Sequence, residues 1–174
     1  MNKYLYLSKR DSVKGGKDVF GGVKLFLRPR YGSNSPIRTN TVEGKAVTEL
    51  DGAYKIDSFM AKQIKYLFDV DLKEDSFLNV QVSLWGKPAE SILKFNPETG
   101  DLYMLFATNA KLVDFERKSG ETGYQLRVTA FDFDLVKRNN SNERQQNPAT
   151  NTQSYPQQSP GDFELMDDND DLPF

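Results

Sequence analysis

Hydrophobic and polar residues alternate over short stretches in the first 138 residues of the chain. The stretch 23–31, VKLFLRPRY, is a clear case, and its inward positions are Val23, Leu25 and Leu27. Side chains on a β-strand point alternately to opposite faces, so the other face carries one ring and three cations: Phe26, Lys24, Arg28 and Arg30. Such a face suits phosphates and stacked bases, although a solvated outer face with one stray Phe fits this strand almost as well.

The only tryptophan lies on the polar face of a second alternating stretch. In residues 79–85, NVQVSLW, the inward positions are Val80, Val82 and Leu84, and Trp85 is in phase with the polar residues. Exposed aromatic surface of this size marks a contact site, unless the end of the strand lets the ring pack under a loop. Trp85 is therefore a candidate for base stacking.

Further patterns predict helices and a long hairpin. Residues 57–69, DSFMAKQIKYLFD, have hydrophobic residues at helical spacing and Asp57 or Ser58 as a possible N-cap, which predicts an amphipathic helix. Pro88 in GKPAESILKF predicts a second, brief helix after the Trp85 strand. The apolar stretch DLYMLFATN predicts a central strand, and the glycines of 118–123 predict a hairpin connection. The body is therefore predicted to be mainly β, with one or two short helices.

A polar segment separates this body from the end of the chain. Residues 139–161 are dominated by Asn, Gln, Ser, Thr and Pro, with one aromatic residue, Tyr155. Such a segment cannot bury enough apolar surface to offset its ordering entropy, so we expect a disordered linker. The chain then divides into a body at 1–138, a linker at 139–161 and a tip at 162–174.

The tip, DFELMDDNDDLPF, sets acidic residues against an apolar ending. Its candidate partner-binding residues are Asp167, Asp168, Asp170, Asp171, Leu172, Pro173 and Phe174. Pro173 stiffens the backbone and presents Phe174, whereas the acids favour a basic rim around an apolar pocket. Leu and Phe add nothing to solubility, so a protein-binding tip is favoured over a solubilising tail.

Composition argues against an enzyme. The chain has no Cys and no His, which removes the commonest general base and the commonest metal ligands. The Gly15–Asp18 segment, GGKD, lacks the upstream Gly and the following Ser or Thr of a phosphate-binding loop. We therefore expect no catalytic residues, no metal and no cofactor. With no bilayer-length apolar run and no signal-peptide core, the sequence predicts a cytoplasmic protein without membrane contact.

Charge is divided unevenly along the chain. Residues 1–138 hold 22 Lys and Arg against 18 Asp and Glu, whereas residues 139–174 hold one against seven. A mildly basic body can neutralise phosphates, and an acidic tail that lay transiently in the same groove would compete with nucleic acid.

Three segments resemble those of bacterial single-stranded-DNA-binding proteins. VQVSLWGKPAE is similar to a family strand with a base-stacking aromatic at the position of Trp85, and VDFERKSGETGY is similar to a segment with a second one at the position of Phe115. The ending resembles the family's acidic tip, which recruits replication, recombination and repair proteins. The resemblance implies a five-stranded oligonucleotide/oligosaccharide-binding barrel with a disordered tail, commonly assembled as a homotetramer or a homodimer.

The chain also departs from that family. Asn79 stands where the family often has Trp, the helix at 57–69 looks like an addition, and residues 31–76 match poorly. These departures favour a version from a bacteriophage or mobile element within a bacterial host cell. They also leave open the path of DNA across the Trp85 strand.

The predicted function is therefore binding and protection of single-stranded DNA, with little sequence preference, during replication, recombination or repair. Bases are expected to stack on Trp85, Phe115 and Phe26, and phosphates to contact Lys24, Arg28, Arg30, Lys87 and Arg127. Rings and cations alone do not separate DNA from RNA, so an RNA-binding or transcription-regulatory barrel is the main alternative. A third possibility is a structural adaptor, in which the barrel binds no nucleic acid and serves only as a scaffold for the tip.

Overall fold

The computed structural model describes residues 3–139 of the 174-residue chain. Its elements, in chain order, are β1 (Leu5–Asp11), β2 (Lys17–Phe26), β3 (Ile37–Val42), β4 (Lys45–Lys55), α1 (Ser58–Phe68), β5 (Phe77–Trp85), α2 (Lys87–Leu93), β6 (Leu102–Glu116) and β7 (Thr122–Lys137). The predicted tip, and the predicted linker beyond Asn139, lie outside the described residues.

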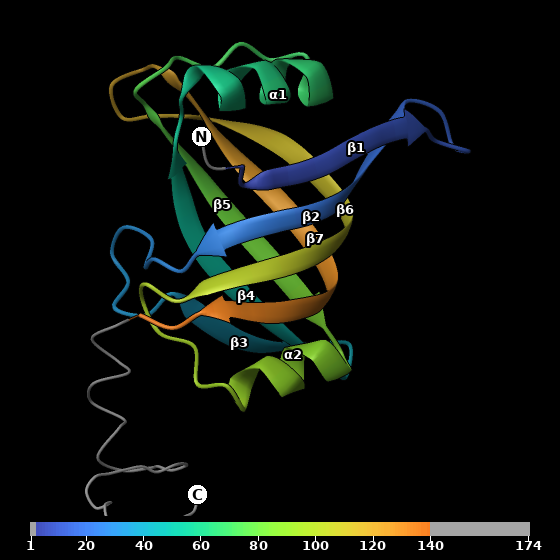
Figure 1. The fold of residues 1–174 in the computed structure, drawn as a ribbon, viewed down its shortest axis with the longest axis vertical. Coiled ribbons are helices and arrows are strands. Elements are labelled where there is room, and N and C mark those ends of the chain that lie inside the picture. Colours follow the sequence, from blue (N-terminus) through green and yellow to red (C-terminus); the bar gives the residue numbers. More distant parts are fainter. Residues whose placement is uncertain (1–2, 140–174) are drawn as a thin grey trace, which may run out of the picture. The chain divides into compact units, whose positions relative to one another are not determined.

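All seven strands belong to one sheet in the order β1-β2-β6-β7-β5-β4-β3. Neighbouring strands are antiparallel except β5 and β7, which are parallel. Just after β2, an isolated bridge joins Leu27 to Gly52 of β4, and the Arg28 amide donates to the Asp51 carbonyl oxygen at 2.9 Å. This short seam, rather than a continuous ladder, brings β2 and β4 together, so five strands curl around a common core (Figure 1).

The five curled strands are β2, β4, β5, β6 and β7, with α2 between the third and the fourth of them. This arrangement is that of an oligonucleotide/oligosaccharide-binding fold, so the predicted mainly β class is confirmed. Two strands add to the predicted five. β1 pairs with the free side of β2 and β3 with the free side of β4, and these two form the ends of the sheet.

Inward-facing side chains of the curled strands fill the core. The predicted inward positions of two strands are all buried: Val23, Leu25, Leu27, Val80, Val82 and Leu84. The predicted strand at 23–31 extended too far, because β2 ends at Phe26 and residues 28–31 form a loop. Pro29 explains the difference, since it has no amide hydrogen with which to continue a ladder.

The two helices lie at opposite ends of the curled sheet (Figure 1). Asp57 caps α1 by accepting a hydrogen bond from the Met60 amide at 2.8 Å, and Met60, Ile64 and Leu67 are buried. Pro88 lies in the first turn of α2, as predicted. Both predicted helices are therefore confirmed. Neither helix of the described body has the length and hydrophobicity that a membrane span requires.

Gly52 allows the seam to form. A Cβ at this position would lie 2.4 Å from Leu25 Cδ1 and 2.6 Å from the Phe26 carbonyl oxygen. Real Cβ atoms do not approach other atoms so closely, so any larger residue would push β2 and β4 apart. The close approach of these strands therefore depends on a residue without a side chain.

Candidate nucleic-acid interface

The outward face of β5 carries an exposed ring at each end. Its outward positions are Phe77, Asn79, Gln81, Ser83 and Trp85, and the two rings are 54% and 41% exposed. At about 3.3 Å per residue, the ends of this strand lie about 26 Å apart. One strand thus presents two well-separated aromatic positions on the same face.

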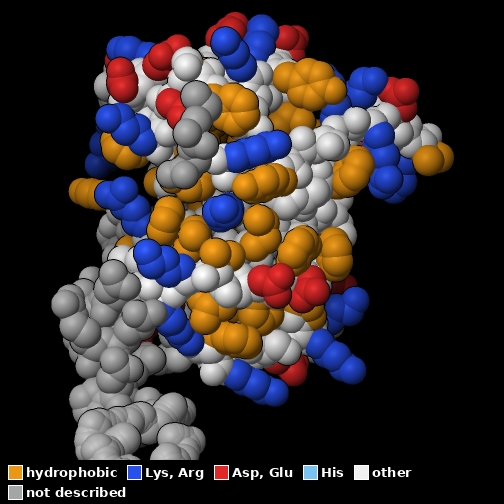
Figure 2. Space-filling model, in the orientation of Figure 1, with side chains coloured by type: hydrophobic (Ala, Val, Ile, Leu, Met, Phe, Trp, Pro, Cys, Tyr) orange, Lys and Arg blue, Asp and Glu red, His pale blue; other side chains and the backbone are white. Residues whose placement is uncertain are grey.

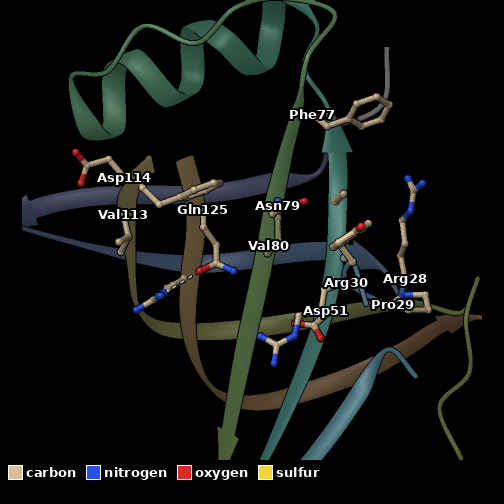
Figure 3. Close-up of a pocket in the computed structure, with 15 residues that line it drawn as sticks. Arg28, Pro29, Arg30, Asp51, Phe77, Asn79, Val80, Val113, Asp114 and Gln125 are labelled. Carbon is tan, nitrogen blue, oxygen red and sulfur yellow. Dashed lines mark hydrogen bonds between the residues drawn. The ribbon is translucent and has the colours of Figure 1, made fainter. Parts of the chain in front are cut away.

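Near the Phe77 end the surface is hollowed into a groove of about 600 Å³ (Figure 3), which we call the arginine groove. Its walls come from the loop after β2 and from β4, β5, β6 and β7. Four of the residues predicted to bind DNA line it: Arg28, Arg30, Phe115 and Arg127. Residues far apart in the sequence are therefore brought together here.

The three arginines of this groove are not neutralised by ion pairs. None of the salt bridges among residues 3–139 involves Arg28, Arg30 or Arg127. The Arg127 Nε donates to the Gln125 Oε1 at 2.9 Å, which orients the guanidinium without cancelling its charge. Clustered cations of this kind favour the binding of phosphate groups.

The buried acid in the wall of the groove, Asp51, has its own partner. The Arg38 Nη1 lies 2.7 Å from the Asp51 Oδ2, and the Arg38 Nη2 lies 2.9 Å from a Glu49 carboxylate oxygen. Burial raises the pKa of Asp51, although Arg38 and then Arg30 act to lower it. Arg38 therefore ties β3 to β4 and is the partner of Asp51. The other acid in the lining is the exposed Asp114, which is outnumbered by Arg28, Arg30 and Arg127.

A second groove, of about 720 Å³, lies beside the first and is called here the Phe26 groove. Arg28 and Phe77 line both grooves. The ring of Tyr4 stacks on Tyr54 with centroids 5.4 Å apart and meets Phe26 edge-on at 6.2 Å. The predicted stacking residue Phe26 is thus part of an aromatic cluster at the border of a groove.

Tyr54 anchors this cluster. Its hydroxyl donates to the Lys24 carbonyl oxygen at 2.7 Å. Burial, and to a lesser extent Tyr4, raises the pKa of Tyr54 well above its usual value. The phenol therefore stays neutral and keeps its hydrogen bond across the ordinary pH range, which fixes the wall of the Phe26 groove.

Phe115 lies on β6 opposite Gly123 of β7. A Cβ at Gly123 would be 2.6 Å from the Phe115 Cζ, so the ring lies over the glycine. The guanidinium of Arg117 is 5.6 Å from the ring centroid. With 40% of its surface exposed, Phe115 presents a ring beside cations, as a base-stacking position requires.

The other three predicted residues lie outside the two grooves. Trp85 pairs with Val47 at the far end of β5, and Lys87 begins α2 immediately afterwards. Lys24 lies on β2 with its Nζ 5.7 Å from the centroid of Tyr6. Figure 2 shows hydrophobic and cationic side chains interleaved on one face of the body. The predicted residues are therefore spread over the two grooves, the Trp85 end of β5 and the Lys24 position on β2.

Phe77 was not among the predicted site residues, although it lines both grooves. A signal for it exists in the sequence, because the alternation that places Trp85 outward continues back through Asn79 to Phe77.

Exposed carboxylates near the grooves do not make a metal site. Within residues 3–139, no three His, Cys, Asp or Glu side chains are grouped so that they could hold an ion.

No protein-family model matches the chain, and no curated protein does. Among solved structures, a deletion mutant of the single-stranded DNA binding protein from Thermus aquaticus is similar, with 16% identity, a TM-score of 0.41 and 68% of this chain covered. The wild-type Thermus aquaticus protein has 16% identity, a TM-score of 0.39 and the same coverage. The chain spans 50% of the length of each of these two chains.

A mitochondrial protein is also similar. The mitochondrial single-stranded DNA binding protein Rim1 from S. cerevisiae has 18% identity and a TM-score of 0.39. The alignment covers 69% of this chain and 98% of the yeast chain. The structural neighbours of the protein thus include bacterial and mitochondrial single-stranded DNA binding proteins.

Proposed function

We propose that the protein binds and protects single-stranded DNA with little sequence preference. The observation that carries this proposal is the arginine groove, in which Arg28, Arg30 and Arg127 lie beside the exposed ring of Phe115. Cations hold any phosphate backbone and a ring face stacks on any base, so such a groove favours single strands without reading sequence. A duplex hides its base faces and gains only the phosphate contacts.

Each candidate residue has a role in this proposal. Bases stack on Trp85, Phe115 and Phe26, and phosphates are neutralised by Lys24, Arg28, Arg30, Lys87 and Arg127. Binding is passive: it covers the strand and opposes reannealing during replication, recombination or repair. No bond is made or broken, which agrees with a chain that has no His and no Cys.

The resemblance in VQVSLWGKPAE and VDFERKSGETGY supports DNA rather than RNA as the ligand. Fluorescence anisotropy of labelled oligo(dT) with the full chain, in competition with oligo(rU) and a DNA duplex of equal length, tests this. We expect oligo(dT) to be displaced poorly by either competitor. Tighter binding of oligo(rU) would favour the RNA-binding alternative, and tight binding of one duplex sequence would favour a regulator.

We further propose that the tip at 162–174 recruits replication, recombination and repair proteins. The apolar ending supports this, because Leu172 and Phe174 supply an anchor that the acids cannot. Pull-downs would compare the full chain, a chain lacking Phe174 and a 1–161 truncation. Recovery of the partners should fall for both variants while DNA affinity stays equal or rises. Equal recovery of partner proteins by all three versions of the chain would show that the tip only solubilises the protein.

Assembly as a homotetramer or homodimer is also proposed, on the family resemblance. Light scattering coupled to size exclusion, with and without oligo(dT), measures the mass directly. A mass of two or four times 19.8 kDa is expected. A mass of one chain, at concentrations where the protein binds DNA, would contradict the proposed assembly.

A further inference from the structure

We propose that Phe77 and Arg28 form a central platform that carries a single strand from the Phe26 groove into the arginine groove. The inference rests on the proposed function and adds to it a residue and a path. In this path the strand first crosses the sheet from β2 to β5 and on to β6, and only a longer strand continues along β5 to Trp85. Phe77 is the stacking ring at the crossing point, and Arg28 is the cation beside it.

The position of the pair is the first argument. Phe77 and Arg28 each line both grooves, so a strand that occupies the two grooves must pass over them. In Figure 3 the side chain of Arg28 extends towards the ring of Phe77, and the guanidinium carbon lies 5.9 Å from the ring centroid. A base stacked on this ring would place its phosphate within reach of the arginine.

Exposure of the ring is the second argument. Phe77 is 54% exposed, whereas the next residue, Leu78, is fully buried and provides the packing of this part of β5. An apolar ring that contributes little to the core and stands between two grooves is arranged for contact with a ligand. The backbone from which the Arg28 side chain extends is anchored at the seam, because the Arg28 amide donates to the Asp51 carbonyl oxygen.

The neighbouring acids are largely engaged, which is the third argument. In the Phe26 groove, Asp57 accepts the capping hydrogen bond of α1, and Asp75 lies 3.9 Å from the Lys55 ammonium. In the arginine groove, Asp51 is paired with Arg38. Asp114 of the arginine groove forms no salt bridge among residues 3–139, but Arg28, Arg30 and Arg127 outnumber it. Positive charge is therefore left for phosphates where the strand enters that groove.

The identity of residue 79 is the fourth argument. Asn79 lies in the arginine groove on the same face as Phe77, and its amide cannot provide a ring face for a base. Phe77, two residues earlier, is the nearest ring on that face of β5. Phe26, Phe77 and Phe115 then supply one ring each from β2, β5 and β6, which defines a path across the strands.

The first test compares Phe77→Ala with Phe131→Ala. Phe131 is a matched control, because it is the same residue type, is 57% exposed, lies on a strand and packs near Phe106, outside both grooves. Phe77→Ala should weaken oligo(dT) binding roughly 5- to 150-fold, the equivalent of one stacked base. Phe131→Ala should leave binding unchanged. Equal affinities of the two variants would overturn the platform.

Substitutions at the same position separate stacking from hydrophobic contact. Phe77→Trp keeps a ring face and should retain affinity, whereas Phe77→Leu keeps an apolar side chain and should lose nearly as much as Phe77→Ala. Thermal unfolding of each variant should match the parent, since Phe77 is mostly exposed. Full affinity in Phe77→Leu would show that the side chain does not stack on a base.

The path itself is tested with a tryptophan reporter. In a Trp85→Phe background, which removes the only natural Trp, the reporter is placed by Phe77→Trp or, as a control, by Phe131→Trp. Oligo(dT) should quench the emission at position 77 and leave position 131 unchanged. Binding by anisotropy without quenching at 77 would overturn the path while the proposed function stands. Failure of the unmodified full chain to bind oligo(dT) would overturn both.

Discussion

The two ends of β5 carry similar exposed rings in very different surroundings. The Phe77 end is bordered by two grooves and by Arg28, Arg30 and Arg127. The Trp85 end faces Val47 across the ladder and is followed at once by α2, with Lys87 as its adjacent cation. We therefore expect a single strand to bind first at the Phe77 end, where an exposed ring lies beside a groove and several cations.

The difference arises from how the sheet closes. Near Phe77 the seam between Leu27 and Gly52 brings the β2 loop against β4, and the loop contributes Arg28 and Arg30 to the groove. Near Trp85, α2 is fixed to β4 by a hydrogen bond of 2.7 Å from the Thr48 hydroxyl to the Ala89 carbonyl oxygen. One end of β5 is therefore shaped by a loop with cations, and the other by a packed helix.

The largest expected effect comes from breaking the seam. Gly52→Ala would place a methyl group against Leu25 and the Phe26 carbonyl, so the free energy of unfolding should fall by about 1–3 kcal/mol. The control is Gly22→Ala, whose nearest contact is the flexible Met104 sulfur at 3.2 Å and whose loss should be smaller. Urea denaturation measures both. If the Gly52→Ala variant is as stable as the parent, the close approach at Gly52 does not stabilise the seam. The seam would then not explain why the two ends of β5 have different surroundings.

Rings at the two ends should respond differently to the length of the ligand. Phe115→Ala should weaken short and long oligo(dT) alike by about 1–3 kcal/mol. Trp85→Ala should cost about the same only for strands long enough to span the roughly 26 Å of β5, and only those strands should quench Trp85 emission. Titrations with oligonucleotides of increasing length measure both. A loss for Trp85→Ala with the shortest strands that bind would place the primary site at the other end.

Salt dependence should separate the cations of the two ends. Each phosphate contact adds about 0.7 to the magnitude of the log–log slope of affinity against salt. Arg28→Glu or Arg30→Glu should flatten that slope for every length of oligo(dT), whereas Lys87→Glu should flatten it only for long strands. The measurement is anisotropy at several salt concentrations. An unchanged slope in Arg28→Glu would contradict the role of the arginine groove.

A smaller effect is expected beneath Phe115. Gly123→Ala would place a methyl group 2.6 Å from the present position of the Phe115 Cζ, so the ring must swing away from the strand. Binding of oligo(dT) should weaken by about 1 kcal/mol, less than for Phe115→Ala, because the ring is displaced and not lost. If Gly123→Ala also weakens binding in a Phe115→Ala background, the ring does not carry the effect.

Local patterns in the sequence were enough to predict much of this fold. The two-residue period placed Val23, Leu25 and Leu27 in the core, and Asp57, one of the two candidate N-caps, caps α1. These features depend on neighbours along the chain, and the periodicity records them directly. The end of β2 was misplaced because Pro29 terminates the ladder inside a stretch that still alternates.

Long-range contacts explain what the sequence did not predict. The grooves are built from β2, β4, β5, β6 and β7 together, so no single segment contains their pattern. The seam brings the β2 loop against β4, and Arg28 of that loop lies beside Phe77, so both residues line both grooves. Trp85 and Phe115 were linked by family resemblance, yet the structure places Phe115 in the arginine groove and Trp85 at the far end of β5.

Photo-crosslinking of the full chain tests most directly the claim that single strands bind at the Phe77 end. A short oligo(dT) with 5-iododeoxyuridine at each position in turn would be irradiated with the protein, and the crosslinked residues mapped by mass spectrometry. We predict crosslinks to Phe77, Phe115 and Phe26, with Trp85 appearing only for longer strands. Crosslinks confined to Phe106 and Phe131, or to Trp85 with the shortest strands, would contradict this account.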